Sequence, residues 1–418
     1  MLKQDDPLMP AIIITSHTMG LGVIRSLGIM GVPLYVFYYD KNDMGYVSKY
    51  VREAIYCPHP EKNESEFIKI LLEYGNQLGG SLLMPVDDAS LSVVSKNKAL
   101  LAKHYKVACP DWKTTVKYID KKYTYELADK IGVPCPKTIV PHDLAEVHSY
   151  SKDIQYPCIV KPCESHKYYE LFQKKMTIVS SPEEMIDAYR EAAEAGIEVM
   201  IQEYIPGGDA NGVNYNSYIH GDATAVDFTA EKVRYSPPGI GVPRVVVSKH
   251  VPEVIDSGRR ILRAMGYHGY SCTEFKKDPR DGVYKLMEIN GRHNRSTLLA
   301  VRCGINFPWI EYAYFFNRGI TYNHHPEDGV YWIDELRDII HSVKYFREER
   351  YSFKQYIRPY LKPHIFAILD VKDPKPFLKR IYDLIKKALH LLWPSNIKGK
   401  EKEGLGASSS IHKSKSIK

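Results

Sequence analysis

The first third of the chain alternates short apolar runs with amphipathic stretches. AIIIT (11–15), PLYVFYYD (33–40) and SLLMPV (81–86) have the length of buried strands, and a helical pattern over 66–78 precedes the third run. Strands that alternate with helices in this way form parallel sheets, because a parallel connection needs a crossover helix. The pattern predicts a parallel α/β domain over residues 1–110.

The turn after the first apolar run has the sequence SHTMGLG. Gly20 and Gly22 resemble the start of a dinucleotide-binding GxGxxG turn, but position 25 is Arg where that motif has its third glycine. Glycines in the tight turn before a helix are common in any βα unit. An oxidoreductase that uses this sheet for its cofactor is therefore disfavoured.

From residue 111 onward, helical patterns mix with strands that alternate apolar and polar residues. The predicted elements are a helix at 120–136 closed by Gly132, a strand at 156–162, a helix at 181–196, a strand at 198–205, an antiparallel pair at 212–235, a helix at 252–266 and a hairpin at 272–290. We expect an α+β domain over 111–320 with two lobes, 111–200 and 201–320, and a C-terminal accessory helical segment over 321–394.

The second strand of the hairpin carries polar side chains on one face. Glu288, Asn290 and Arg292 occupy alternate positions, so they point to the same side of the strand. A turn centred on Asp281 pairs Glu288 with Glu274, and two facing carboxylates repel each other. A divalent cation between them reverses that interaction, and oxygen ligands of this kind suit Mg²⁺. The pattern favours a metal site over a solvent-facing hairpin with scattered charges.

Three other polar positions carry weak signals when each is taken alone. Lys161 ends an apolar strand and Lys121 begins a helix. A lysine at either position can be a solvated surface charge or a contact for phosphate. Gln202 and Glu203 end a strand and lead into a Pro-Gly turn, where a hinge could present backbone groups to a planar base.

Charge and cysteine content narrow the classes of partner. The net charge of +7 belongs to the C-terminus, because 375–393 and 394–418 each carry +4 and the other 374 residues sum to −1. A body of nearly zero charge excludes a general nucleic-acid binder. The seven cysteines form no CxxC pair, and the chain has neither a signal peptide nor an apolar run of membrane-spanning length. These features predict a cytoplasmic protein with free thiols.

The C-terminal stretch FLKRIYDLIKKALHLLW (377–393) gathers its charged residues in one helical arc. Such a helix either caps the core or lies on anionic lipid. The second alternative predicts peripheral membrane contact on the cytoplasmic face and a cell-envelope precursor as substrate. Residues 395–418 are of low complexity, and we expect them to be a disordered basic tail.

Taken in this order, the motifs resemble those of the ATP-grasp superfamily. The most specific part is Glu274, in TEF, followed fourteen residues later by Glu288-Ile-Asn290-Gly-Arg292, which is similar to the family's paired metal-binding acids and E-x-N-x-R strand. The resemblance covers about residues 1–320. The chain most resembles the carboligase-like branch of the superfamily, which is related to biotin carboxylase and carbamoyl phosphate synthase. The D-aspartate ligases belong near that branch. The sequence DPKPF (373–377) is also similar to members of it.

The resemblance implies an ATP-grasp fold, α/β and α+β, behind a pre-ATP-grasp parallel α/β domain, with ATP between the two lobes. The residues implied in nucleotide binding are Lys121 and Lys161 for the phosphates, Gln202, Glu203 and the backbone through Ile205 for the adenine, and Asp209 for the ribose. The implied ligands of two Mg²⁺ ions, for which Mn²⁺ could substitute, are Glu274, Glu288 and Asn290. Arg292 and Lys161 would be catalytic, with Arg292 stabilising an acyl phosphate or the substrate carboxylate.

The implied reaction is ATP-dependent ligation of a carboxylate to an amine. The carboxylate attacks the γ-phosphoryl group, and the amine then displaces phosphate from the mixed anhydride. The substrates would be small molecules, an amino acid or a cell-envelope precursor, and Arg295 and Arg244 are further cations that could meet an anionic one. The alternative is a nucleotide-binding regulatory or scaffold protein with an inactive ATP-grasp fold. The sequence leaves the substrate pair and the oligomeric state open.

One segment departs from the family pattern. Many members close a glycine-rich loop over the phosphates after the position of Lys161, but CESHKYYELFQKK (163–175) contains no glycine. Either the side chains of Ser165, His166, Lys167 or Lys175 take over that role, or closure over the phosphates is lost.

Overall fold

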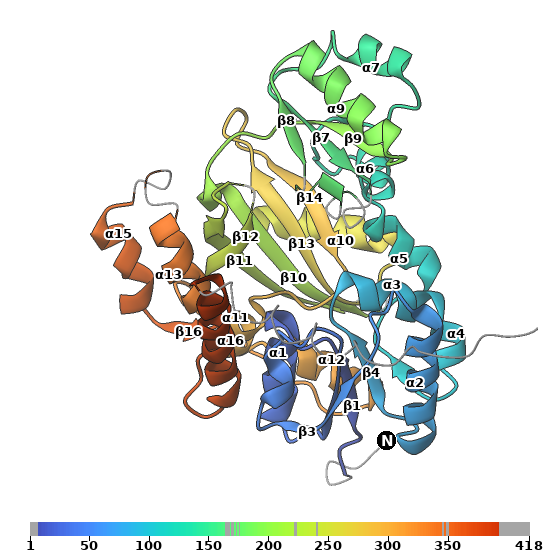
Figure 1. Cartoon of the computed structure of the whole chain (residues 1–418), viewed down its shortest axis with the longest axis vertical. Helices are drawn as coiled ribbons and strands as arrows, with labels where there is room; N and C mark the ends of the chain where they lie inside the picture. Colours follow the sequence, from blue (N-terminus) through green and yellow to red (C-terminus); the bar gives the residue numbers. More distant parts are fainter. Residues whose placement is uncertain are drawn as a thin grey trace, which may run out of the picture.

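The computed structural model describes residues 7–163, 168, 171–172, 174, 176–220, 224–239, 241–344, 347 and 351–392. Three sheets organise these residues, with five, four and seven strands (Figure 1). The five-stranded sheet forms the N-terminal domain at the bottom of the view, and the four-stranded sheet forms a small lobe at the top. The seven-stranded sheet lies between them and carries a cluster of helices at its far edge.

The N-terminal domain is the parallel α/β unit predicted from the sequence. Its elements are β1 (Ala11–Ile14), α1 (Thr18–Gly28), β2 (Leu34–Tyr38), β3 (Val51–Tyr56), α2 (Glu64–Gln77), β4 (Leu82–Pro85), α3 (Asp88–Lys96), α4 (Lys98–Leu101) and β5 (Lys106–Val107). The strand order is β3-β2-β1-β4-β5, and every pair is parallel. β1 and β4 are buried along their whole length, as expected for central strands with helices on both faces.

The turn between β1 and α1 explains the glycines of SHTMGLG. Thr15 has a φ of 80°, an uncommon conformation for a β-branched residue. A Cβ on Gly20 would lie 2.3 Å from the carbonyl oxygen of Thr15, so only glycine fits there. A Cβ on Gly22 would meet Thr297 at 3.5 Å, an ordinary contact. Gly20 is therefore required by the packing of the turn itself.

The small lobe contains the predicted helices and strands, and it also has elements that were not predicted. Its elements are α5 (Trp112–Ile119), α6 (Lys121–Lys130), β6 (Thr138–Ile139), α7 (Leu144–Tyr150), β7 (Cys158–Pro162), β8 (Thr177–Val179), α9 (Pro182–Glu194) and β9 (Val199–Glu203). α9 begins where the sequence indicates, because the Ser181 hydroxyl accepts from the backbone N–H of Glu184 and Pro182 occupies the first turn. β9 pairs with β6 and β7, so this lobe's sheet extends to residue 203.

The large sheet has the order β14-β13-β10-β11-β12-β15-β16. Its first strands and associated helices are β10 (Gly212–His220), β11 (Thr224–Ser236), β12 (Val242–Ser248), α10 (Pro252–Met265), β13 (Gly269–Lys277), β14 (Tyr284–Asn290), α11 (Thr297–Arg302) and α12 (Phe307–Phe315). α10 packs closely on β10, since a Cβ on Gly258 would meet the ring of Tyr215 at 2.2 Å.

The C-terminal segment contains strands as well as helices. Its elements include β15 (Tyr331–Ile333), α13 (Glu335–Lys344), α15 (Phe353–Ile357), the short helix η3 (Arg358–Leu361), β16 (His364–Phe366) and α16 (Lys375–Leu392). β15 pairs with β12 and β16 pairs with β15, so the large sheet continues into a segment that we expected to be helical. Strands of three residues are too short to produce a recognisable alternation in the sequence.

The hairpin pairs Glu274 directly with Glu288, as predicted, but for a different geometrical reason. Lys277 faces Tyr284 and Phe275 faces Leu286, so the turn is centred half a residue before Asp281. A β-bulge between the Phe275 and Glu274 pairs inserts Met287 and restores the expected pairing. The bulge also contacts the small lobe, because Tyr125 Oη donates to the Met287 carbonyl at 2.5 Å and Leu286 N donates to the Pro134 carbonyl at 2.8 Å.

A carboxylate in the DPKPF sequence helps to hold the C-terminal segment on the N-terminal domain. Asp373 is fully buried, and its carboxylate accepts from Arg25 Nε at 3.0 Å, Ser48 Oγ at 2.7 Å and Lys49 N at 2.9 Å. The predicted tail, 395–418, lies outside the described residues. Among the described helices, none has both the length and the apolar character needed to cross a bilayer.

Candidate active site

The paired carboxylates of the hairpin are each held by a lysine from another element. Lys121 Nζ, at the start of α6, lies 3.0 Å from Glu288 Oε1. Lys232 Nζ, on β11, donates to Glu274 Oε2, and Asn290 Nδ2 lies 3.4 Å from Glu274 Oε1. Two carboxylates and an amide thus lie on neighbouring positions of β13 and β14, near the end of β14, and this set of oxygen donors fits a hard divalent cation.

Both carboxylates are accessible, and Glu288 is held in its charged form. Burial disfavours the charged form of Glu288, but Lys121, Lys161 and Arg292 outweigh that cost and lower its pKa to about 2. The side chains of Glu274 and Glu288 remain 27% and 38% exposed. A ligand can therefore reach both carboxylates and compete with the lysines that neutralise them.

Lys161 approaches the same centre from the small lobe. Its Nζ donates to Tyr125 Oη at 2.9 Å and lies 4.8 Å from the centroid of that ring. Burial, followed by repulsion from Lys121, lowers the pKa of Lys161 to about 7, although Glu288 opposes the shift. A buried lysine with so little compensating charge is suited to an incoming anion such as a phosphate.

The hinge residues occupy different positions around β9. The Gln202 side chain is fully buried, and its Nε2 donates to Thr138 Oγ1 at 2.7 Å. The Glu203 carboxylate accepts from Arg280 Nη2 at 2.5 Å and from Lys137 N at 3.1 Å. The Ile205 carbonyl accepts from Lys276 Nζ at 2.8 Å. Gln202 is therefore enclosed within the small lobe, whereas the carboxylate of Glu203 is engaged by Arg280.

Asp209, predicted to meet a ribose, contacts the backbone of a neighbouring turn. One carboxylate oxygen accepts from Tyr235 N at 2.8 Å and the other from Gly239 N at 2.6 Å. Arg244 is fully buried and donates to Asp338 Oδ1 at 2.8 Å, away from the hairpin carboxylates. Arg244 is therefore part of the core and not a surface cation.

Arg292 connects the metal strand to the N-terminal domain. Its guanidinium donates to both carboxylate oxygens of Asp88, at 2.7 and 2.8 Å, and to Asn290 Oδ1 at 3.0 Å. The fork geometry of these bonds fixes the guanidinium at the end of the carboxylate pair. The structure therefore brings together Lys121, Lys161, Glu274, Glu288, Asn290 and Arg292, and their roles toward ATP and metal stay predictions.

Sequence reasoning missed Lys232, Tyr125 and Asp88. Lys232 is buried and reaches Glu274 across β10, where Gly212 leaves the space: a Cβ there would meet Lys232 Cδ at 3.1 Å. No local pattern relates positions so distant in sequence.

Four residues of the glycine-free loop lie outside the described residues: Ser165, His166, Lys167 and Lys175. In the described part of that loop, Tyr168 Oη bonds Thr177 Oγ1 at 3.0 Å.

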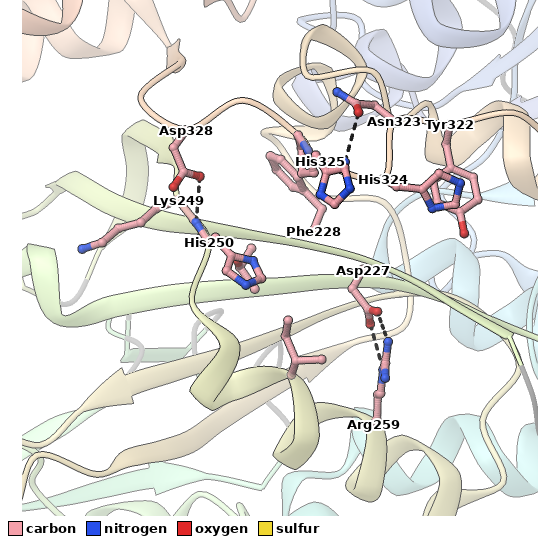
Figure 2. Close-up of a pocket in the computed structure, with 13 residues that line it drawn as sticks. Asp227, Phe228, Lys249, His250, Arg259, Tyr322, Asn323, His324, His325 and Asp328 are labelled. Carbon is pink, nitrogen blue, oxygen red and sulfur yellow. Dashed lines mark hydrogen bonds and ion pairs between the residues drawn. The ribbon is translucent and has the colours of Figure 1, made fainter.

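A separate cavity of about 500 Å³ lies between α10, the ends of β11 and β12 and residues 322–328 (Figure 2). Some of its polar residues bond to one another: Arg259 binds Asp227, and the His250 backbone N–H donates to Asp328 at 2.8 Å. None of the predicted site residues lines it. The cavity is therefore distinct from the candidate active site.

Comparison with known proteins shows which proteins the chain resembles. No protein-family model matches the chain. A D-aspartate ligase from Enterococcus faecium (strain Aus0004) is 27% identical over 254 residues, which cover 56% of this chain and 58% of that relative. The chain thus spans little more than half of the relative's length.

Solved structures show which fold the chain has. The biotin carboxylase of Campylobacter jejuni, in a β-γ-ATP complex, superposes with a TM-score of 0.63 at 15% identity, over 77% of this chain and 74% of that one. An L-amino acid ligase from Bacillus licheniformis superposes with a TM-score of 0.58 at 16% identity, over 74% and 75% of the two chains. The chain has the ATP-grasp fold, and the resemblance and fold class predicted from its sequence are confirmed.

Proposed function

We propose that this protein is an ATP-dependent carboxylate–amine ligase that works through an acyl phosphate. The observation that carries the proposal is the contact network that joins Lys121 to Glu288, Lys232 to Glu274 and Arg292 to Asn290. The network joins cations suited to phosphates with oxygen atoms suited to a metal ion, and phosphoryl transfer needs both, which supports the proposal. The relatives and structural neighbours that are amino acid ligases support this class of reaction.

ATP would lie between the small lobe and the large sheet, with Gln202, Glu203, Ile205 and Asp209 around its nucleoside. Glu274, Glu288 and Asn290 would hold two Mg²⁺ ions, or Mn²⁺, which when bound neutralise charge on the phosphates. Lys121 and Lys161 would contact the phosphate oxygens. Because Lys121 and Lys232 now neutralise the two carboxylates, both lysines would exchange these partners when the metal and nucleotide bind.

Arg292 would act at the reacting group. Its guanidinium is held by Asp88 and Asn290, and it could stabilise the charge on the acyl phosphate without first reorganising. The carboxylate oxygen forms a bond to the γ-phosphorus as the bond to ADP breaks. The amine nitrogen then attacks the acyl carbon, loses a proton and expels inorganic phosphate.

The competing proposal is a scaffold that binds nucleotide without turnover. Phosphate release is measured over a panel of amino acids for wild type, Glu288→Ala and the surface control Glu191→Gln. Release that depends on a carboxylate–amine pair, persists in Glu191→Gln and disappears in Glu288→Ala supports the ligase. Nucleotide binding without release across the panel would identify the scaffold instead.

We further propose peripheral membrane contact through residues 377–393. Leu378, Tyr382, Ile385 and Leu389 are each 54–62% exposed and lie on one face of α16 at helical spacing. Lysines 379, 386 and 387 flank this stripe, so the helix offers apolar and cationic contacts together. The first turns of the same helix also reach the body, since Lys379 Nζ donates to the Lys41 carbonyl at 3.1 Å. Capping and lipid contact are thus compatible.

Co-sedimentation with vesicles tests the membrane proposal. Full-length protein and an Ile385→Asp, Leu389→Asp variant are compared on phosphatidylglycerol-containing and pure phosphatidylcholine vesicles. We expect only wild type on anionic vesicles to pellet; equal pelleting of both proteins would reject lipid contact through α16. A cytoplasmic location, on the inner face of the membrane, is proposed because all seven cysteines are free. A lipid-linked cell-envelope precursor would fit that location.

A further inference from the structure

Two asparagines of β10, Asn214 and Asn216, point to the same face of the large sheet and differ in their bonding. Both residues are 4% exposed. Asn216 Oδ1 accepts from Tyr270 Oη at 2.9 Å and from Asn294 Nδ2 at 2.7 Å. Asn216 Nδ2 donates to the Phe228 carbonyl at 3.2 Å. Asn214 Oδ1, by contrast, is buried without a hydrogen-bond partner among the described residues. A buried amide oxygen without a donor is costly, which points to a donor that arrives in another state of the protein.

Asn214 lies beside the paired carboxylates of the candidate active site. It faces Glu274 on β13 and Ala230 on β11, and Glu274 in turn faces Glu288 on β14. Residues that face each other across antiparallel strands have their side chains on the same side of the sheet. Asn214 therefore belongs to the row that carries both carboxylates, and on its other side Ala230 offers the amide only a methyl group.

The side chain of Lys232 reaches this row from the neighbouring one. A Cβ on Gly212 would meet Lys232 Cδ at 3.1 Å, so the lysine stem passes over β10 two residues before Asn214. Its Nζ then donates to Glu274 Oε2, and Glu274 is the residue that faces Asn214. The Lys232 side chain is only 3% exposed. Its ammonium group therefore needs a protein acceptor, because a buried charge without a partner is very costly.

A cation at Glu274 would compete with Lys232 for one carboxylate. Two positive charges on the same carboxylate repel each other, and burial prevents Lys232 from turning to solvent instead. The lysine would then need a second acceptor in its immediate surroundings. Asn214 Oδ1 meets that need, because it is buried in the same row and has no donor among the described residues.

We propose that Asn214 is a positioning residue of the metal site, whose Oδ1 accepts the Lys232 ammonium when a divalent cation binds Glu274. The lysine then keeps a charge-assisted hydrogen bond in both states, first to a carboxylate and then to an amide. One hydrogen bond breaks and another forms, and no proton is transferred. This inference rests on the proposed function, which supplies the cation at Glu274.

A double-mutant cycle on Asn214 and Lys232 tests the exchange, with the affinity for Mn²⁺ as its readout. Mn²⁺ binding is titrated by electron paramagnetic resonance, with and without ADP, for wild type, Asn214→Leu, Lys232→Met and the double variant. We expect Asn214→Leu to raise the Kd for Mn²⁺ about 10-fold, because Lys232 loses its second acceptor. In the Lys232→Met background the same substitution should change the Kd by less than about 2-fold, because no ammonium has to move.

Thermal unfolding without metal separates the exchange from a structural role. Asn214→Leu should leave the Tm unchanged or raise it by about 1–3 °C, because it removes an unpaired buried amide. The matched control is Asn216→Leu, which should lower the Tm, because Tyr270 and Asn294 lose their acceptor. The Kd for Mn²⁺ of folded Asn216→Leu should stay within about 2-fold of wild type.

Three outcomes would overturn the exchange. Equal weakening of Mn²⁺ binding by Asn214→Leu in both Lys232 backgrounds would make Asn214 a direct ligand of the cation. An unchanged Kd together with a lower Tm would make it a structural residue. If Glu288→Gln abolishes Mn²⁺ binding and Asn214→Leu does not alter it, the metal site stands and only the exchange is rejected. Absence of Mn²⁺ binding in wild type would instead reject the metal site of the proposed function, and the exchange with it.

Discussion

Two clusters of charged residues start from the same strand and differ in what surrounds them. Lys232 and Arg234 are two positions apart on β11. Lys232 pairs with Glu274 in the candidate active site, whereas Arg234 donates to both oxygens of Asp338 at 2.9 and 2.8 Å. Asp338 also accepts from Arg244 Nε and from Tyr360 Oη at 2.7 Å. We call this second group the anchor cluster, because it joins the large sheet to α13.

Burial and saturation distinguish the two clusters. Asp338 is fully buried, and its two oxygens accept from three side chains, so no ligand can replace a partner. Glu274 and Glu288 are partly exposed, with Lys232 bonded to Glu274 and Lys121 bonded to Glu288, so a ligand can reach both carboxylates. A buried ion pair therefore indicates a functional site only when its partners are accessible and exchangeable.

The largest expected effect is on the anchor cluster. Asp338→Ala would leave two guanidiniums in the core without their carboxylate, and loss of one partner of a buried pair costs about 3–5 kcal/mol of unfolding free energy. Urea unfolding monitored by circular dichroism measures this change. The kcat of the molecules that remain folded should stay near wild type. A loss below about 1 kcal/mol would show that the cluster does not anchor α13.

The site cluster should show the opposite behaviour. Glu288→Gln removes a metal-ligating charge, and we expect kcat to fall by at least about 100-fold, or about 2.7 kcal/mol of activation free energy. The free energy of unfolding should fall by less than in Asp338→Ala, because the side chain is partly exposed and Gln keeps its shape. Steady-state phosphate release and urea unfolding, run on the same preparation, separate the two effects.

Because of Lys161, we expect stability and ATP binding to depend on pH. Its pKa is lowered to about 7 in the folded protein, so the unfolded state binds more protons between pH 7 and the ordinary value of 10.5, and this group makes stability rise with pH across that window. Nucleotide phosphates would raise the pKa again. At pH 8 we therefore expect ATP binding to take up close to one proton, measured by calorimetry in buffers of different ionisation enthalpy.

Lys161→Met is the control for this proton uptake. The variant should bind ATP more weakly and without the uptake at pH 8. Uptake that persists in Lys161→Met would assign the proton to another group.

The smallest effect is expected at an exposed ion pair. Lys174 Nζ lies 3.3 Å from Glu191, and the two side chains are 38% and 51% exposed. Lys174→Ala should change the unfolding free energy by less than about 1 kcal/mol, because solvent screens the pair. Thermal unfolding at low and high salt checks this, and a larger loss would mean that exposure is a poor guide to which pairs matter.

Several features of the site follow from local geometry and could be predicted. Glu288, Asn290 and Arg292 share a face because side chains alternate along any strand, and the helix starts and turns follow from Ser181, Pro182 and glycine positions. The pairing of Glu274 with Glu288 was also predicted, yet it depends on the bulge at Met287 that compensates for a shifted turn. Nothing in the hairpin sequence required that bulge.

What the sequence determined by itself was the order of helices and strands, the face on which the metal-type ligands lie, and the resemblance they create. Only the tertiary structure decided which charges neutralise them: Lys232 reaches Glu274 across Gly212, Asp88 holds Arg292, and the short strands β15 and β16 extend the sheet toward α13 and α16. Hydrophobic periodicity relates residues only a few positions apart, so it can be read from the sequence. Partnership between charges depends on long-range packing, which no local pattern encodes.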